Sequence, residues 1–440
     1  MTYVFSEQPS PRLSYTLDFI FSARGLTYQC TSDWETFEAI KGPKLNYSER
    51  EASDALNLTP SALLFENDVR NYAIDQFEID LGEVISFDGV PDMLASMFFV
   101  LSRYEEYWET DRDRHDRFQG TESLQSLFGW LHIPIADHWA EALIERLCLA
   151  EQPQREFLIA PTFDIDATFA YREKGLFRNG LGLLKDLFFG KIARVKERIA
   201  VIRGQRPDPF DTFERIAEIA SQHPETRCFW LMSDYGPYHK NLPDSNPVQA
   251  EIIRKIAKIC PVGIHPGYGT YTDPSNLNRE KLRLEAVLES RVSTSRQHFL
   301  QLKLPHTYEQ LCRENILVDY SMGYADQPGF RMGTARRTPW YNLRTNEVSE
   351  LQLQPFCYMD GTLNEYLRLT PEQAIEEVRA LREEIQRYGG TFCFIWHNET
   401  LGFQYHWQGW EKVLLEGLKS EAAFKTSPPP RYSPFDELLK

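Results

Sequence analysis

From residue 157 onward, short apolar runs alternate with stretches of helical pattern, and each run ends at acidic, hydroxyl or histidine side chains. The runs span residues 157–163, 228–232, 261–264 and 391–396. Apolar periodicity predicts helices between them, at residues 210–221, 247–258, 279–290 and 371–388. Buried strands that alternate with helices are typical of an α/β fold with a largely parallel sheet.

Two carboxylates follow the first run. In α/β barrels the carboxyl ends of the strands form the functional face. Asp164 and Asp166 are two residues apart, so both emerge on the same side of a strand. Neighbouring carboxylates repel each other unless a cation or a shared proton relieves the repulsion. The pair therefore indicates metal binding together with proton transfer from an attacking water, or, alternatively, a turn whose Asp caps the next helix.

Two histidines follow later runs. His265 comes after the third run, where Gly263 and Gly267 allow a tight turn, and is a candidate metal ligand. His397 closes the last run, and a histidine can donate a proton to a leaving group near neutral pH. A satisfied structural histidine is the alternative at each position, with Trp396 packing against His397 in the second case.

Two charged stretches complete the set. In residues 293–300, Arg296 and His298 are two apart and face the same side if the segment is a strand. Residues 111–118, Asp-Arg-Asp-Arg-His-Asp-Arg-Phe, are predicted to form a solvated loop. Arg331 and Arg337 are further candidates, although each alone is more typical of a surface or structural arginine.

Taken in order, these pieces resemble the polysaccharide deacetylase family of carbohydrate esterases. The resemblance rests on Thr-Phe-Asp-Ile-Asp at 162–166, on His265, on Arg296 and on Phe-Ile-Trp-His at 394–397, over residues 157 to about 410. It implies a distorted (β/α)₇ barrel and a divalent metal, usually zinc. The implied ligands are Asp166 and His265; the implied catalytic residues are Asp164 as base, His397 as acid and Arg296, which orients Asp164.

The sequence departs from the family where the second histidine of its metal motif is expected. Those positions hold Gly269 and Thr270. His298 is the natural substitute as third ligand, because it lies two residues from the motif arginine. Tyr268 and Tyr271 are weaker alternatives.

The N-terminal part resembles an extra domain found in a bacterial subgroup of predicted deacetylases. This resemblance rests on Leu-Ser-Arg-Tyr-Glu-Glu-Tyr at 101–107, with Ser-Arg-Gln-His at 295–298 and Gly-Phe-Arg-Met-Gly-Thr at 329–334 in the barrel. We therefore expect a smaller α+β accessory domain over 1–152 and the barrel over 153–440. Residues 151–156, which are polar and include Pro153, are the expected linker.

Composition restricts the partners. The net charge of −16 disfavours nucleic acid and anionic membrane, which repel an acidic surface. Seven cysteines without a CxxC pair do not suggest a disulfide framework. The first residues lack the pattern of a signal peptide, and no window is apolar enough for a membrane span. A cytoplasmic location is therefore expected, and the oligomeric state stays open.

The expected function is hydrolytic removal of an N-acyl group, acetyl above all, from an amino sugar in a glycan or glycan precursor. Two alternatives remain at this stage. One is a metal-poor glycan-binding or scaffold protein, which the Gly269 and Thr270 departure favours. The other is a metal hydrolase that acts on a different C–N bond.

Overall fold

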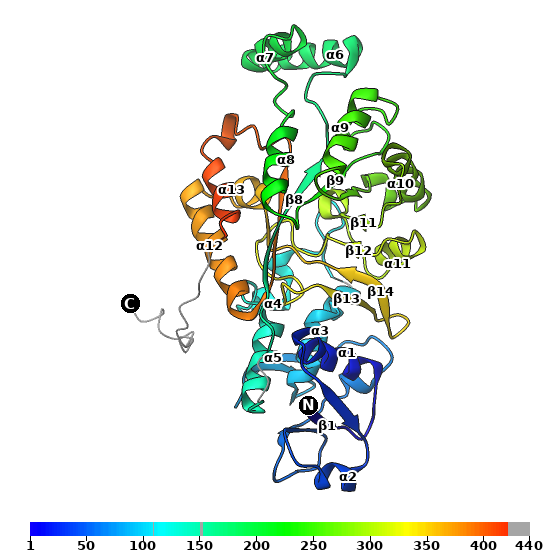
Figure 1. Ribbon diagram of the computed structural model, residues 1–440, viewed down its shortest axis with the longest axis vertical. Helices are drawn as coiled ribbons and strands as arrows, with labels where there is room; N and C mark the ends of the chain where they lie inside the picture. The colour runs from blue at the N-terminus through cyan, green and yellow to red at the C-terminus, as the bar shows by residue number, and fades with distance from the viewer. Residues whose placement is uncertain (109, 150–152, 421–440) are drawn as a thin grey trace.

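The computed structural model describes residues 1–108, 110–149 and 153–420. The described residues form two parts. The N-terminal part has two small sheets, and the C-terminal part is built on one large sheet (Figure 1). The expected boundary at 152/153 and the first residues of the expected linker lie outside the described residues.

The N-terminal part combines two small sheets with helices. The first sheet is fully parallel, with the order β2-β1-β3-β4, and the second is antiparallel, with the order β5-β6-β7. Their strands are β1 (Thr2–Phe5), β2 (Tyr28–Thr31), β3 (Lys44–Tyr47), β4 (Leu56–Leu58), β5 (Ile74–Ile79), β6 (Gly82–Phe87) and β7 (Val90–Pro91). The helices are α1 (Pro11–Ile20), α2 (Trp34–Ala39), α3 (Met93–Leu101), α4 (Leu124–Leu127) and α5 (Ile135–Arg146).

The C-terminal part is a mixed α/β structure around a nine-stranded sheet of order β13-β14-β12-β11-β10-β9-β8-β16-β15. Only the β13–β14 pair is antiparallel among the ladders of this sheet in the described residues. The strands are β8 (Phe157–Ile165), β9 (Arg227–Trp230), β10 (Val262–Ile264), β11 (Thr294–Ser295), β12 (Val318–Asp319), β13 (Thr338–Asn342), β14 (Glu347–Leu353), β15 (Tyr358–Met359) and β16 (Gly390–His397). Within the described ranges, no ladder joins the edge strands β13 and β15.

Helices cover the sheet or follow its strands. They are α6 (Gly175–Phe188), α7 (Ile192–Ile202), α8 (Phe213–Gln222), α9 (Pro247–Ala257), α10 (Ser275–Leu288), α11 (His306–Arg313), α12 (Pro371–Tyr388) and α13 (Glu411–Gly417). The four predicted strands and the four predicted helices are confirmed, with shifts of a few residues at their ends. The prediction of an α/β fold with a largely parallel sheet is therefore confirmed.

Helix α12 illustrates how local sequence signals fix an element against the sheet. The Thr370 hydroxyl accepts the backbone N–H of Gln373, the Gln373 side chain accepts the backbone N–H of Thr370, and Pro371 occupies the first helical position. Its buried stripe is spaced three or four residues apart, at Ala374, Val378, Leu381 and Ile385. This stripe belongs to the main core, which also contains Phe392 and Phe394 of β16.

The two parts share buried contacts. Tyr341 and Leu343, at the end of β13, belong to the apolar core of the N-terminal part. The buried carboxylate of Glu106 accepts hydrogen bonds from Arg331 at 2.9 and 2.6 Å and from Arg103 at 2.7 Å. Arg331 is thus a structural residue that joins the two parts.

Candidate metal centre and active site

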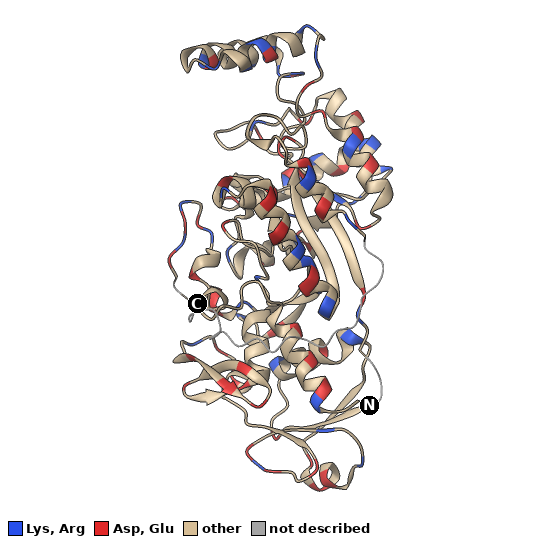
Figure 2. Ribbon diagram, turned by 90° about the vertical axis from the view of Figure 1, so that its left-hand side faces the viewer, with Lys and Arg blue, Asp and Glu red and all other residues tan. Residues whose placement is uncertain are grey.

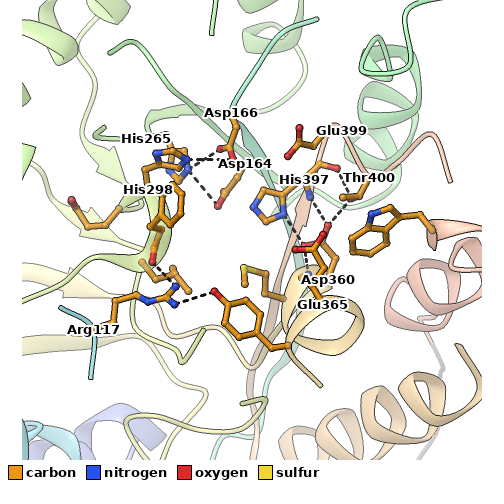
Figure 3. A pocket seen from close by; sticks show the side chains of 17 residues that line it. Arg117, Asp164, Asp166, His265, His298, Asp360, Glu365, His397, Glu399 and Thr400 are labelled. Atoms are coloured by element: carbon orange, nitrogen blue, oxygen red, sulfur yellow. Dashed lines mark hydrogen bonds and ion pairs between the residues drawn. The ribbon is translucent and has the colours of Figure 1, made fainter. Parts of the chain in front are cut away.

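The sheet brings the predicted site residues to one edge. Asp164 and Asp166 lie at the carboxyl end of β8, His265 directly follows β10, and Arg296 directly follows β11. His397 is the last residue of β16 and is in register with Asp164 on the neighbouring parallel strand. Because the strands are parallel, their carboxyl ends meet at the same edge, and Figure 3 shows the side chains of Asp164, Asp166, His265 and His397 converging there.

Asp166, His265 and His298 form a group that could hold a metal ion. One ligand atom from each lies within 4.8 Å of the others. Nε2 of His265 is 3.2 Å from Oδ1 of Asp166, and Nε2 of His298 is 3.4 Å from Oδ2 of the same carboxylate. Burial disfavours the charged carboxylate, but the two histidines outweigh this effect and hold the pKa of Asp166 well below its usual range.

The environment of His265 fixes which nitrogen faces Asp166. Nδ1 of His265 lies 2.6 Å from the carbonyl oxygen of Arg296, which can only accept a hydrogen bond. Nδ1 therefore carries a proton, and Nε2 is the nitrogen that faces Asp166 and is left to bind a cation. Oδ1 of Asp166 is buried and accepts no hydrogen bond from any described residue. A ring nitrogen beside a buried carboxylate oxygen that lacks a hydrogen bond fits a bound cation.

His298 reaches this group from a turn and not from a strand. β11 ends at Ser295, and His298 begins a 3-10 turn in which Phe299 and Leu300 have φ angles of 60° and 54°. The expectation that Arg296 and His298 share a strand is therefore wrong. Gln297, between the two residues, is still extended, and both side chains approach the β8 carboxylates.

The charged stretch 111–118 supports that turn. Arg117 donates hydrogen bonds to the carbonyl oxygen of Phe299 and to the hydroxyl of Tyr366, both at 3.0 Å, and is paired with Asp113 at 2.6 Å. The His115 ring packs against Phe299, with ring centroids 4.9 Å apart. Both His115 and Arg117 are buried. The prediction of a solvated loop is wrong here, because the arginine charge is satisfied inside the protein.

Arg296 holds Asp164. Its Nη1 lies 3.1 Å from Oδ1 of Asp164 and 2.7 Å from Oγ1 of Thr162, and its Nε donates to the carbonyl oxygen of Tyr320 at 3.0 Å. The guanidinium is fully buried. A charge-assisted hydrogen bond of this kind fixes the direction of the carboxylate.

His397 faces the same cavity from the other side and is held by Asp360. Nδ1 of His397 is 2.7 Å from Oδ1 of Asp360, whose Oδ2 also accepts from Oγ1 of Thr400 at 2.6 Å. Sequence reasoning missed Asp360. A signal was present, because it directly follows the short apolar run 356–359 just as the other site residues follow theirs.

These groups line one cavity of about 190 Å³. Its wall carries side chains from both parts of the chain, including Arg117, Glu365, Tyr366, Glu399 and Trp407 (Figure 3). Tyr268 and Tyr271, the weaker alternatives for a third ligand, are not among the described residues that line it. Tyr268 instead stacks on Tyr238, and the Tyr271 hydroxyl bonds Asp116.

Comparison with known proteins gives two findings. Residues 2–151 match a family model described as a family of unknown function (DUF7033). A crystal structure described as a "putative polysaccharide deacetylase" from Mycobacterium smegmatis is similar, at 17% identity and a TM-score of 0.36, over 61% of this chain and 85% of that chain. No curated protein matches the chain.

Proposed function

We propose that the protein is a metal-dependent hydrolase that removes an N-acyl group, with acetyl the expected group, from an amino sugar in a glycan or glycan precursor. We also propose that its large sheet is a distorted barrel of the polysaccharide-deacetylase type. The observation that carries the proposal is the arrangement of one cavity. A three-residue metal-binding group and an arginine-held carboxylate lie on one side, and a histidine held by a buried carboxylate lies on the other.

Asp166, His265 and His298 would hold the metal ion. Two imidazole nitrogens and one carboxylate oxygen form a ligand set that suits zinc and leaves a coordination position open. When bound, such an ion lowers the pKa of water from about 16 toward about 7 and polarises the amide carbonyl.

Asp164 would act as the general base. Arg296 and Thr162 hold the carboxyl end of β8 in place, and Oδ1 of Asp164 is occupied by the arginine. Oδ2 is the oxygen left to accept the proton of the attacking water. The distance of 3.8 Å between this oxygen and Nε2 of His265 places the base next to the metal-binding group.

His397 would act as the general acid. Burial alone disfavours its charged form, but the carboxylate of Asp360 outweighs burial and raises the pKa of His397 well above its usual value. The ring is then protonated at neutral pH. Nδ1 is bonded to Asp360, so Nε2 is the nitrogen that can give its proton to the departing amine.

The volume of the cavity restricts the size of the acyl group that can bind. Its volume of about 190 Å³ is below the roughly 300–1,000 Å³ that is usual for ligand pockets. A small acyl group such as acetyl fits this space better than a long acyl chain. Tyr366 and Trp407 on the wall offer apolar ring surface with polar edges, which suits the mixed surface of a sugar.

Purified protein tests the proposal through metal content and a panel of substrates. We expect about one zinc or similar ion per chain and hydrolysis of N-acetylated amino sugars. Asp164→Asn keeps the shape of the side chain but cannot accept the proton, so kcat should fall about 10²–10⁴-fold while metal content is unchanged.

Three outcomes would contradict the proposal. Absence of stoichiometric metal would indicate the scaffold alternative. Full metal content with hydrolysis of amides other than acylated sugars would indicate another C–N bond. Loss of metal in Asp164→Asn would make Asp164 a ligand.

A further inference from the structure

Helices α6 and α7 form a hairpin that stands away from the rest of the molecule (Figure 1). Its large apolar side chains are strongly exposed: Leu176 by 89%, Phe177 by 78%, Phe188 by 85% and Phe189 by 61%. Further exposed apolar residues of the hairpin are Leu181, Leu184, Leu187, Ile192 and Ile202. Soluble proteins seldom expose contiguous apolar surface of this kind unless it binds something.

The exposed apolar residues follow a helical period. Phe177, Leu181, Leu184 and Phe188 are spaced three or four residues apart, so they form one stripe along α6. A helix of a soluble protein normally turns such a stripe toward the core. Here the stripe faces outward, and Phe188 and Phe189 continue it into the turn that leads to α7.

The hairpin is basic, although the whole chain is acidic. Residues 175–206 contain eight Lys and Arg and two acidic residues, whereas the whole chain has 48 Lys and Arg against 64 Asp and Glu. Exposed cations lie on and just beyond both helices (blue at the top of Figure 2), at Lys185, Lys191, Arg194, Lys196, Arg203 and Arg206. The net charge of the whole chain is negative and therefore does not reveal that this segment is positively charged.

Both acidic residues of the hairpin are buried and already satisfied. Asp186 pairs with Arg198 at 2.7 Å. Glu197 accepts hydrogen bonds from the hydroxyls of Tyr171 and Tyr405, at 2.8 and 2.9 Å. The surface that the hairpin offers to a partner is therefore apolar and cationic, without exposed carboxylates.

We propose that this hairpin docks on the surface of an anionic phospholipid bilayer. Helices with exposed apolar stripes and flanking cations lie in the membrane interface, where the apolar side chains enter the acyl boundary and the cations meet lipid phosphates. The long Lys and Arg side chains reach the headgroups while their stems remain in apolar surroundings. A second copy of the chain is a poorer occupant, because two basic hairpins repel each other. Among the described residues, no helix is long and apolar enough to cross the bilayer.

The root of the hairpin adjoins the cavity. The carboxylate of Asp208 accepts the backbone N–H groups of Ala170, Tyr171 and Arg172, only a few residues beyond Asp166. Tyr405, which bonds Glu197, is two residues from Trp407 in the cavity wall. Docking would thus hold the cavity near the lipid surface. If the proposed function holds, this favours an amino sugar that is linked to a lipid.

Co-sedimentation of the full chain with vesicles tests the docking without any measurement of metal or activity. One set of vesicles is phosphatidylcholine alone, and the other is an equal mixture of phosphatidylcholine and phosphatidylglycerol. We expect binding to the mixed vesicles, at least about tenfold weaker binding to phosphatidylcholine, and a loss of binding as salt is raised.

Two variants separate the apolar and the charged contributions. Phe177→Ser with Phe188→Ser removes apolar contacts, and Arg194→Glu with Lys196→Glu reverses two charges. Each should weaken vesicle binding by about tenfold or more. The matched control, Lys41→Glu with Arg291→Glu, makes the same charge change at exposed residues outside the hairpin that form no ion pair within the described part of the chain. It should bind like the unaltered protein, and all variants should keep the far-UV circular dichroism of the fold, because the altered side chains are exposed.

Three results would overturn the inference. The unaltered protein could fail to bind mixed vesicles at low salt, or both hairpin variants could bind as well as the control. The third is a dimer in solution that the Phe177→Ser, Phe188→Ser variant converts to a monomer, which would make a second copy the occupant. Vesicle binding with no hydrolase activity would refute the proposed function and leave the docking intact.

Discussion

Asp360 lies 2.7 Å from Nδ1 of His397 through its Oδ1, and its Oδ2 accepts the backbone N–H of the same histidine at 2.9 Å. The carboxylate is fully buried. It therefore sets both the orientation of the imidazole ring and its charge. His397 can serve as the acid of the proposed reaction only if this charge remains in place.

As pH is raised, the activity of Asp360→Asn should begin to fall at a lower pH than that of the unaltered protein. The substitution keeps the shape but removes the charge that raises the pKa of His397. Because the acid must be protonated, the alkaline limb of kcat/KM should move to lower pH. Activity at pH 7 should fall about ten- to a hundredfold, less than the loss of the acid itself would cost. Profiles of kcat/KM against pH, with metal content measured in parallel, check this.

Thr400→Val is the control for that experiment. It removes one hydrogen bond to Asp360 and leaves the charge, so the alkaline limb should stay where it is. An unchanged limb in Asp360→Asn would show that another group donates the proton.

Two buried histidines, His239 and His298, have rings 5.5 Å apart, but replacing each with alanine should change the metal content differently. His298→Ala should lose most of the bound metal, because two remaining ligands form an open and poorly shaped site. His239→Ala should keep it. Nδ1 of His239 is 3.1 Å from the carbonyl oxygen of Asp234, and its Nε2 accepts the N–H of Tyr268 at 2.8 Å, so neither nitrogen is free for a cation.

Elemental analysis of the two variants, with thermal unfolding as a check on folding, measures the difference. Burial and the neighbouring His298 lower the pKa of His239 to about 4, so its removal deletes a neutral ring and no charge at pH 7. Stoichiometric metal in His298→Ala, or its loss in His239→Ala, would mean that the third ligand is assigned to the wrong histidine.

The strand-end residues could be predicted because buried parallel strands read as continuous apolar runs. β8 and β16 were placed within two residues of their ends for this reason. Four site residues lie at the ends of such strands, so their place in the sequence also predicts their place in the fold: Asp164, Asp166, His265 and His397.

The rest of the site depends on contacts between distant segments. Asp360 follows the apolar run 356–359, but its partner His397 is 37 residues away, and only the fold brings the two together. His298 lies at the start of a turn in which Phe299 adopts a left-handed conformation, and the sequence around it does not predict this turn. Arg117 lies in a stretch whose composition indicates a solvated loop, and only the fold brings Asp113, Phe299 and Tyr366 to satisfy it.

Arg117→Met should weaken metal binding although the residue belongs to the N-terminal part. Its guanidinium holds the carbonyl oxygen of Phe299, next to the proposed ligand His298. Loss of an outer hydrogen bond of this kind typically costs about ten- to a hundredfold in metal affinity. Titration of metal-free protein with Co²⁺, followed by its visible spectrum, measures the change. Arg114→Met, at an exposed neighbour, is the control, and equal affinity in the two variants would contradict the supporting role.

Glu106 joins the two parts of the chain through Arg331 and Arg103. Glu106→Gln leaves the buried guanidinium of Arg331 without its counter-charge and removes one of the two carboxylates that pair with Arg103, so the free energy of unfolding at pH 7 should fall by about 3–5 kcal/mol. Burial alone would raise the pKa of Glu106, but the two arginines outweigh it and lower the pKa to about 2. A lowered pKa stabilises the fold above the unfolded value of about 4.3, and this contribution is lost as pH falls toward 2. The difference in unfolding free energy between the two proteins should therefore shrink over that window.

Urea unfolding at several pH values measures this difference. Glu251→Gln, in the exposed pair with Lys255, is the control and should leave the free energy of unfolding nearly unchanged, because solvent screens that pair. If Glu106→Gln costs no more than this control, Glu106 does not couple the two parts of the chain.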